Sequence, residues 1–410
     1  MLGFDAAGGR VRPGAGILGP VTPPPLSRTP LVLAFALALA AAVSLGLARF
    51  SYALLLPAMR AELHWSYFTA GAMNTANAAG YLVGALLAPR WFARHDALRV
   101  ATAGGLATAA ILVAHAFAGS DAPLYALRTL AGVASAATFV GGGLLATRLS
   151  ARAPHPGLVV GIYYGGAGLG ILAATAIVPP LGWRAAWGAL GAVSLACTLA
   201  TWGVARASRA LVATSPDAPS AARASAPWPP MAPLLAGYLM FGLGYIGYMT
   251  FIVTLLRDQG LPPAWVAAFF ALLGAGVVAS SWIWAGLLQR HRGGRPLAQL
   301  NAILAVATLL PVLSAQPAVV AVSCVLFGGT MLSVVASTTA FVRHNLAPPA
   351  WAAGIAAFTI VFALGQILGP SLSGLLADGA GGLRRGFLFS AIVLALGALV
   401  GSRQRPLAPR

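Results

Sequence analysis

Long apolar runs alternate with short polar connectors along almost the whole chain. A bilayer core about 30 Å thick is crossed by about 20 helical residues, so each run of that length predicts one transmembrane helix. Twelve such runs occur in the sequence: 31–57, 67–89, 98–118, 122–147, 157–179, 184–205, 232–256, 263–288, 297–314, 317–342, 350–377 and 384–402. The pattern therefore predicts an all-α membrane protein with twelve transmembrane helices.

The twelve runs fall into two sets of six. A segment at 206–230, rich in Pro, Ala and Ser, follows the sixth run and predicts a linker. GLARFSY at 46–52 aligns with GLGYIGY at 242–248, which places Tyr245 of the second set opposite Arg49 of the first. Parallel six-helix repeats with a binding site between them are a transporter architecture. The expected organisation is an N-terminal tail at 1–30, bundles at 31–205 and 231–402 around the linker, and a C-terminal tail at 403–410.

Composition and charge placement support a membrane protein and give its orientation. The chain is 59% hydrophobic and 8% charged, with a net charge of +18 from 25 basic residues that are all Arg. Eighteen Arg lie in segments on the side of both termini, and five lie in the opposite connectors. The positive-inside rule then predicts that both termini are cytoplasmic. Nucleic-acid binding is not expected, because the charges form no basic stripe on a soluble domain.

Two arginines lie inside apolar runs: Arg49 in the first predicted helix and Arg128 in the fourth. A charge within the membrane costs at least ~2.5–3.5 kcal/mol on insertion scales, so it is a functional-site hypothesis. Both are expected at similar depth toward the outer side, where they could form a fork for a carboxylate or phosphate. Two other interpretations stay open. Each guanidinium could extend outward or bond helix carbonyls, or Glu62 or Asp121 could reach inward as a partner.

Uncharged polar and aromatic side chains mark further positions for a central cavity. They are Asn74, Asn77 and Tyr81 on one face of the second helix, Tyr52 in the first, Tyr245 and Tyr248 on one face of the seventh, and Gln366 in the eleventh. Together with the two arginines, these residues are the candidate substrate-binding set. The alternative is packing, since amides bond across membrane helices and buried tyrosine hydroxyls find partners.

Catalytic, metal and cofactor sites are not expected from the sequence. Cys197 and Cys324 both fall in apolar runs, which does not fit a disulfide framework or a thiolate metal site. The seven acidic residues lie in tails, loops or helix ends, so no membrane-buried carboxylate is predicted for a proton relay. The glycines at 161–170 and 365–374 predict close helix packing rather than phosphate binding.

Several motifs carry a resemblance to a known family. They are LGLARFSYALLLPAM at 45–59, NAAGYLVGALLAP at 77–89, RTLAG at 128–132, YYGGAGLGI at 163–171, GWRAAW at 182–187 and GQILGPSLSGLLAD at 365–378. With these motifs the chain resembles the major facilitator superfamily and, more narrowly, the YbfB/YjiJ family of its bacterial members. The resemblance covers nearly all of the chain after Pro30. It implies two pseudo-symmetric six-helix bundles, the major facilitator fold, a transport function, and a multi-pass protein of the bacterial inner membrane.

The sequence therefore predicts a secondary active transporter that moves a small, anionic or polar organic solute by alternating access. Efflux of amphipathic, drug-like compounds is a second interpretation, favoured by the aromatic helix faces. A membrane enzyme or a non-transporting sensor is a remote alternative, because the connectors hold too few His and Asp residues for a catalytic constellation. The expected partners are the solute and the lipid bilayer, with protons as the candidate coupling ion, and the protein is expected to be monomeric.

Overall fold

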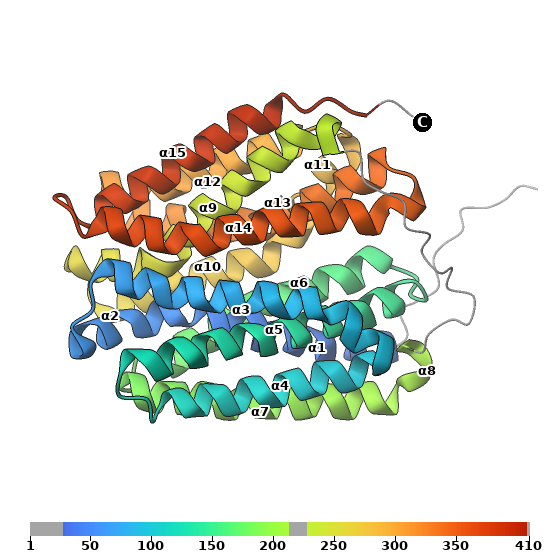
Figure 1. The fold of residues 1–410 in the computed structure, drawn as a ribbon, viewed down its shortest axis with the longest axis horizontal. Helices are drawn as coiled ribbons and strands as arrows, with labels where there is room; N and C mark the ends of the chain where they lie inside the picture. The colour runs from blue at the N-terminus through green and yellow to red at the C-terminus, as the bar shows by residue number, and fades with distance from the viewer. Residues whose placement is uncertain (1–27, 213–227, 408–410) are drawn as a thin grey trace, which may run out of the picture.

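The computed structural model describes residues 28–212 and 228–407, and within them the chain forms helices without any strand (Figure 1). Eleven of these helices are long and apolar enough to cross a membrane. The twelfth is α3 (Tyr67–Arg94), whose 28 residues are also long enough to cross. Its Asn and Tyr side chains make it less apolar than the others. The predicted all-α fold with twelve membrane-spanning helices is confirmed.

In the first half, the first span is composite, since a π-helix, η1, separates two α-helices. The helices of this half are α1 (Arg28–Ala41), η1 (Ala42–Phe50), α2 (Tyr52–Leu63), α3, α4 (Ala97–His115), α5 (Asp121–Ser150), α6 (Pro156–Ile177) and α7 (Trp183–Ala207). The first span continues through Pro57 to Leu63, beyond the predicted end at 57. It ends where His64 adopts a left-handed conformation with φ of 54°.

The second half begins with α9, which starts four residues before the predicted span. Its helices are α9 (Trp228–Asp258), α10 (Pro263–Ile283), α11 (Ala285–Arg290), α12 (Arg295–Leu313), α13 (Pro317–Asn345), the 3₁₀ turn η2 (Pro348–Ala350), α14 (Trp351–Ala377) and α15 (Leu383–Ser402). The predicted eighth helix is interrupted at Trp284, between α10 and α11.

The tail and linker predictions fall largely outside the described part of the chain. This holds for 1–27 of the N-terminal tail, 213–227 of the linker and 408–410 of the C-terminal tail. Of the linker, the described residues include the short helix α8 (Arg209–Val212). Arg152 on the loop after α5 donates to the Leu211 carbonyl of α8 over 2.8 Å, which attaches this helix to the first bundle.

Each half packs as a bundle in which helices distant in sequence are neighbours. In the first half, α5 packs against α3 and α4, and α7 packs against α4. In the second half, α9 packs against α14 and α15, and α13 packs against α10 and α12. Figure 1 shows the start of α1 and the end of α15 on the same side of the molecule. We call this the terminal side and the opposite side the distal side.

Two helix pairs join the halves through closely packed backbones. Where α3 meets α14, a Cβ added at Gly71 would lie 2.2 Å from the Pro370 carbonyl oxygen. Where α6 meets α10, a Cβ added at Gly168 would lie 2.4 Å from the Gly274 carbonyl oxygen. Small residues allow this approach between membrane helices. The glycine series predicted to serve packing therefore includes a contact between the halves.

Gly71→Leu is expected to destabilise the protein because its side chain would collide with the α14 backbone. Overpacking of this kind costs about 1–3 kcal/mol, which is measurable as a lowered unfolding temperature of the purified protein. Gly188→Leu is the matched control, since nothing lies within 4 Å of a Cβ at Gly188. Equal unfolding temperatures for the two variants would show that the α3–α14 contact is not tight.

On the distal side, carboxylates of the second half hold the N-terminus of α3. Asp378 accepts hydrogen bonds from the backbone N–H groups of Tyr67 and Phe68, at 2.7 and 2.9 Å. Asp258 accepts the Tyr67 hydroxyl at 2.7 Å. Nearby, α2 of the first half packs against α9 of the second half. The pair α5 and α13, which also come from the two halves, is less closely packed. The two halves are therefore closed against each other on the distal side.

Candidate functional site

Arg49 lies in the last turn of the π-helix η1, within the first span. The Ser51 N–H bonds the Gly46 carbonyl at 2.9 Å, an i to i+5 contact that widens the helix. Gly46 allows this segment to approach α6, since a Cβ there would lie 2.4 Å from the Gly170 Cα. Single π-helical turns often occur at functional sites. Here the π-helix carries a buried charge at the interface between the halves.

The Arg49 side chain is 5% exposed and contacts the second half of the protein. Its Nη2 donates a hydrogen bond to Oε1 of Gln366 on α14, and its Nε has no acceptor among the described residues. Tyr245 on α9 donates to the same Gln366 oxygen over 2.8 Å. The Arg49 guanidinium also lies 5.8 Å from the ring centroid of Tyr81. Arg49 and its repeat counterpart Tyr245 thus converge on one side chain.

Arg128 is also buried, at 1% exposure, and each of its three guanidinium nitrogens has an acceptor. Its Nη1 donates to the Ala48 carbonyl at 3.0 Å, its Nη2 to Asn74 Oδ1 at 3.2 Å and its Nε to the Met73 carbonyl at 3.5 Å. The guanidinium also lies 4.5 Å from the ring centroid of Tyr52. These partners come from η1, α3 and α2 of the same half. Arg128 therefore joins helices of the first bundle through helix carbonyls, one of the interpretations left open by the sequence.

The two asparagines of α3 divide between a contact across the halves and one within the first half. Asn74 accepts Arg128 and donates from Nδ2 to the Thr250 hydroxyl of α9 at 2.7 Å. Asn77 donates to the Arg128 carbonyl at 3.1 Å, which ties α3 to α5. Both amides are buried, at 3% and 1% exposure. Asn74 is thus next to the interface, while Asn77 packs inside its bundle.

The three tyrosines predicted to line a central cavity, Tyr52, Tyr245 and Tyr248, do not form one surface. The Tyr52 hydroxyl donates to the Ala70 carbonyl of α3 at 2.9 Å, within the first bundle. The Tyr248 hydroxyl bonds Ser323 of α13 at 2.8 Å, and its ring stacks on Phe327 with centroids 3.9 Å apart. Tyr52 and Tyr248 are therefore packed against their own halves. Of the three, Tyr245 shares a partner with Arg49.

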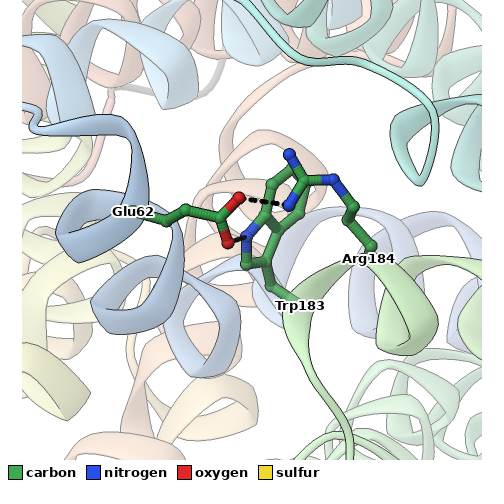
Figure 2. A network of polar contacts seen from close by, with 3 residues as sticks. All are labelled: Glu62, Trp183 and Arg184. Atoms are coloured by element: carbon green, nitrogen blue, oxygen red, sulfur yellow. Dashed lines mark hydrogen bonds and ion pairs between the residues drawn. The ribbon is translucent and has the colours of Figure 1, made fainter.

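Neither Glu62 nor Asp121 reaches inward to the buried arginines. Figure 2 shows Glu62, at the end of α2, bonding both Trp183 and Arg184 at the start of α7. The Trp183 Nε1 donates to Glu62 over 2.7 Å. Arg184 forms a salt bridge with the same carboxylate. Asp121 accepts Trp65 Nε1 at 2.7 Å. Within the described structure, Arg49 has no carboxylate partner.

Further aromatic residues, not predicted from the sequence, pack next to Tyr245 and near Gln366. On α9, Tyr238 and Phe241 precede Tyr245 at helical spacing, and Phe362 of α14 stacks on all three at centroid distances of 5.0–5.6 Å. In the first half, Tyr164 of α6 is 38% exposed and lies near Arg343 of α13 in the other half. The spacing on α9 is a signal that could have been used. Phe362 and Tyr164 come from other helices and carry no such signal.

The same fold, two six-helix halves with buried polar residues where they meet, occurs in solved structures of membrane transporters. A point mutant of the nucleoside transporter NupG superimposes with a TM-score of 0.70 at 15% identity, covering 91% of this chain and 99% of that one. A bacterial homologue of the human lysosomal transporter Spinster, inward-facing and unoccupied, gives 0.66 at 14% identity over 91% and 96%. The human organic anion transporter MFSD10 gives 0.62 at 14% identity over 92% and 100%. At these identities the similarity establishes the fold.

The family model described as "Uncharacterised MFS-type transporter YbfB" matches residues 41–402. The chain therefore belongs to the YbfB-like family of major facilitator superfamily transporters, as its motifs predicted. No curated protein matches the chain. The family and the fold are those of a multi-pass membrane transporter of small molecules, and not of an enzyme.

Proposed function

We propose that this protein is a secondary active transporter for a small organic solute with an anionic or strongly polar group. The observation that carries the proposal is Arg49, a buried cation at the interface between the halves that has an unmet donor and no carboxylate partner among the described residues. A solute anion would supply the missing charge. A charged hydrogen bond to arginine is geometrically specific and about twice as strong as a neutral one.

The same site offers contacts from both halves of the transporter. Arg49 and Tyr81 belong to the first half, whereas Gln366 and Tyr245 belong to the second. A solute held between them would replace part of the direct Arg49–Gln366 bond and so couple binding to the relative position of the halves. A ligand shifts such an equilibrium by its difference in affinity for the two states. This arrangement supports alternating access.

The orientation and access follow from the predicted topology. With both termini in the cytoplasm of a bacterium, the terminal side faces inward and the closed distal side faces outward. The described conformation would then admit a solute from the cytoplasm. Proton coupling and a monomeric state stay predictions.

Efflux of amphipathic compounds is the second candidate, favoured by the aromatic residues on both sides of Arg49. The two functions differ in their need for the guanidinium. Transport of an anion requires Arg49, whereas extrusion of a neutral amphipathic compound through an aromatic passage does not.

Flux in proteoliposomes tests the proposal with a panel of labelled carboxylates, phosphate esters and neutral amphipathic compounds. Arg49→Gln is expected to lower anion flux about 10–100-fold, because a hydrogen bond to a charged group contributes about 1.5–3 kcal/mol. Arg257→Gln is the matched control, since Arg257 is an exposed residue at the end of α9 and should leave flux unchanged. Undiminished anion flux in Arg49→Gln refutes the proposal, and flux confined to neutral compounds favours efflux.

A further inference from the structure

The number of available cations limits the charge of the solute. Each nitrogen of the Arg128 guanidinium has an acceptor in its own half. Arg49 has one hydrogen-bond partner, Gln366, and an Nε without any among the described residues. A solute with two or more negative charges would leave charge unmatched in a low-dielectric region, which is costly. Beside Gln366 the site therefore suits a single negative charge, since Arg343 of the second half is exposed near the end of α13.

On the second half, the surface next to Gln366 is aromatic. Phe362 lies four residues before Gln366 on α14 and stacks on Tyr245 with centroids 5.6 Å apart and planes inclined by 20°. Phe241 stacks on Tyr245 at 4.7 Å, and Tyr238 stacks on Phe362 at 5.0 Å. Phe362 remains partly exposed, whereas the α9 rings beneath it are buried. Its free area is thus a flat apolar surface close to the site.

On the first half, a second group of rings lies near Arg49. Tyr81 has its ring 5.8 Å from the Arg49 guanidinium and is half-buried. Tyr164 lies near Tyr81 and packs edge-on against Phe139, with centroids 5.9 Å apart. Tyr164 is 38% exposed and is close enough to Arg343 of the other half to interact with it electrostatically. Aromatic area therefore flanks the guanidinium on both halves.

We propose that the solute is a planar aromatic monoanion. Its anionic group binds Arg49 and Gln366, and its ring contacts Phe362 on one side and Tyr81 or Tyr164 on the other. This inference rests on the proposed function and adds the chemical class of the solute body. Offset or edge-on aromatic pairs contribute beyond the burial of their area, and a saturated ring of the same size forfeits that contribution.

Equilibrium binding to the full-length protein in lipid nanodiscs tests the inference with three matched probes: 2-naphthoate, decahydro-2-naphthoate and 2-naphthamide. We expect 2-naphthoate to bind about tenfold tighter than its saturated analogue, which corresponds to about 1.4 kcal/mol. Phe362→Leu should abolish this preference while 2-naphthoate still binds better than the amide. Phe35→Leu, at a residue 55% exposed on α1, is the control and should retain both preferences.

Arg49→Gln separates the inference from the function on which it rests. It should abolish the preference for the acid over the amide and leave the aromatic preference in place. Equal binding of the two acids, or binding of neither, overturns the aromatic inference, whatever the effect of Arg49→Gln on anion flux. An acid preference that survives Arg49→Gln contradicts the proposed function instead.

Discussion

Arg128→Met is expected to destabilise the helix bundle by about 2–4 kcal/mol, whereas Arg49→Met should change its stability by less than about 1 kcal/mol. The two arginines are similarly buried, but their contacts differ. Arg128 bonds the Ala48 and Met73 carbonyls and Asn74, and lies over the Tyr52 ring. Arg49 forms one hydrogen bond and lies farther from an aromatic ring, 5.8 Å from the Tyr81 centroid. The reference state is a set of inserted helices, so the cost of inserting each charge is largely common to both states.

Thermal and denaturant unfolding of the two Met variants and the parent protein in the same lipid or detergent measures this difference. Interhelical hydrogen bonds in membranes contribute about 0.6 kcal/mol on average and up to about 1.7 kcal/mol, so three bonds and a cation–π contact give the expected sum. Flux through Arg128→Met can be compared at a temperature where the variant remains folded. Equal losses of stability at both positions would contradict the structural role assigned to Arg128.

Most of the helices could be predicted from the sequence because long apolar segments mark where the chain crosses the bilayer. The composite first span shows a feature that hydropathy does not predict. The sequence AVSLGLARF is compatible with either a π-helix or an α-helix. Its composition therefore does not distinguish η1 from the α-helices on either side of it. The break at Trp284 is likewise a backbone feature inside an apolar run. Such local departures from the α-helix depend on how the segment packs against neighbouring helices.

The candidate site could be predicted in part, through the internal repeat. The alignment of the two halves paired Arg49 with Tyr245. In the structure both side chains bond the same Gln366 oxygen. Depth in the membrane, however, could not separate Arg49 from Arg128. Their difference lies in partners supplied by other helices, namely backbone carbonyls for Arg128 and a side chain of the second half for Arg49. Tyr52 and Tyr248 show the same limit, because helical spacing does not tell which neighbour a helix face meets.

The distal contact shows how charge outside the membrane interior can select one conformation. Asp378 accepts two backbone N–H groups at the start of α3, where the helix dipole also favours a negative charge. Asp258 accepts the hydroxyl of Tyr67, the first residue of that helix. Both acids belong to the second half, and all three donors belong to the first. Opening of the distal side would separate these pairs.

Asp378→Ala is therefore expected to shift the protein toward a distal-open state. Loss of two exposed, charge-assisted hydrogen bonds removes about 1–2 kcal/mol from the closed state, so the ratio of open to closed molecules should rise about tenfold. Spin labels at Ala61→Cys and Ala264→Cys, in the two halves near the distal ends, report this change as a longer distance population. Cys197 and Cys324 are replaced by Ala in all samples.

Asp96→Ala provides the matched control because its carboxylate also caps a helix, but within one half. Asp96 accepts the Leu98 N–H of α4 at 3.0 Å, a contact within the first half. Its loss should lower stability slightly and leave the label distances unchanged. Because the Asp378 contacts are exposed and charged, added salt should reduce the difference between Asp378→Ala and the parent. Unchanged distances in Asp378→Ala would mean that the glycine contacts and the packing of α2 on α9 hold the distal side closed without it.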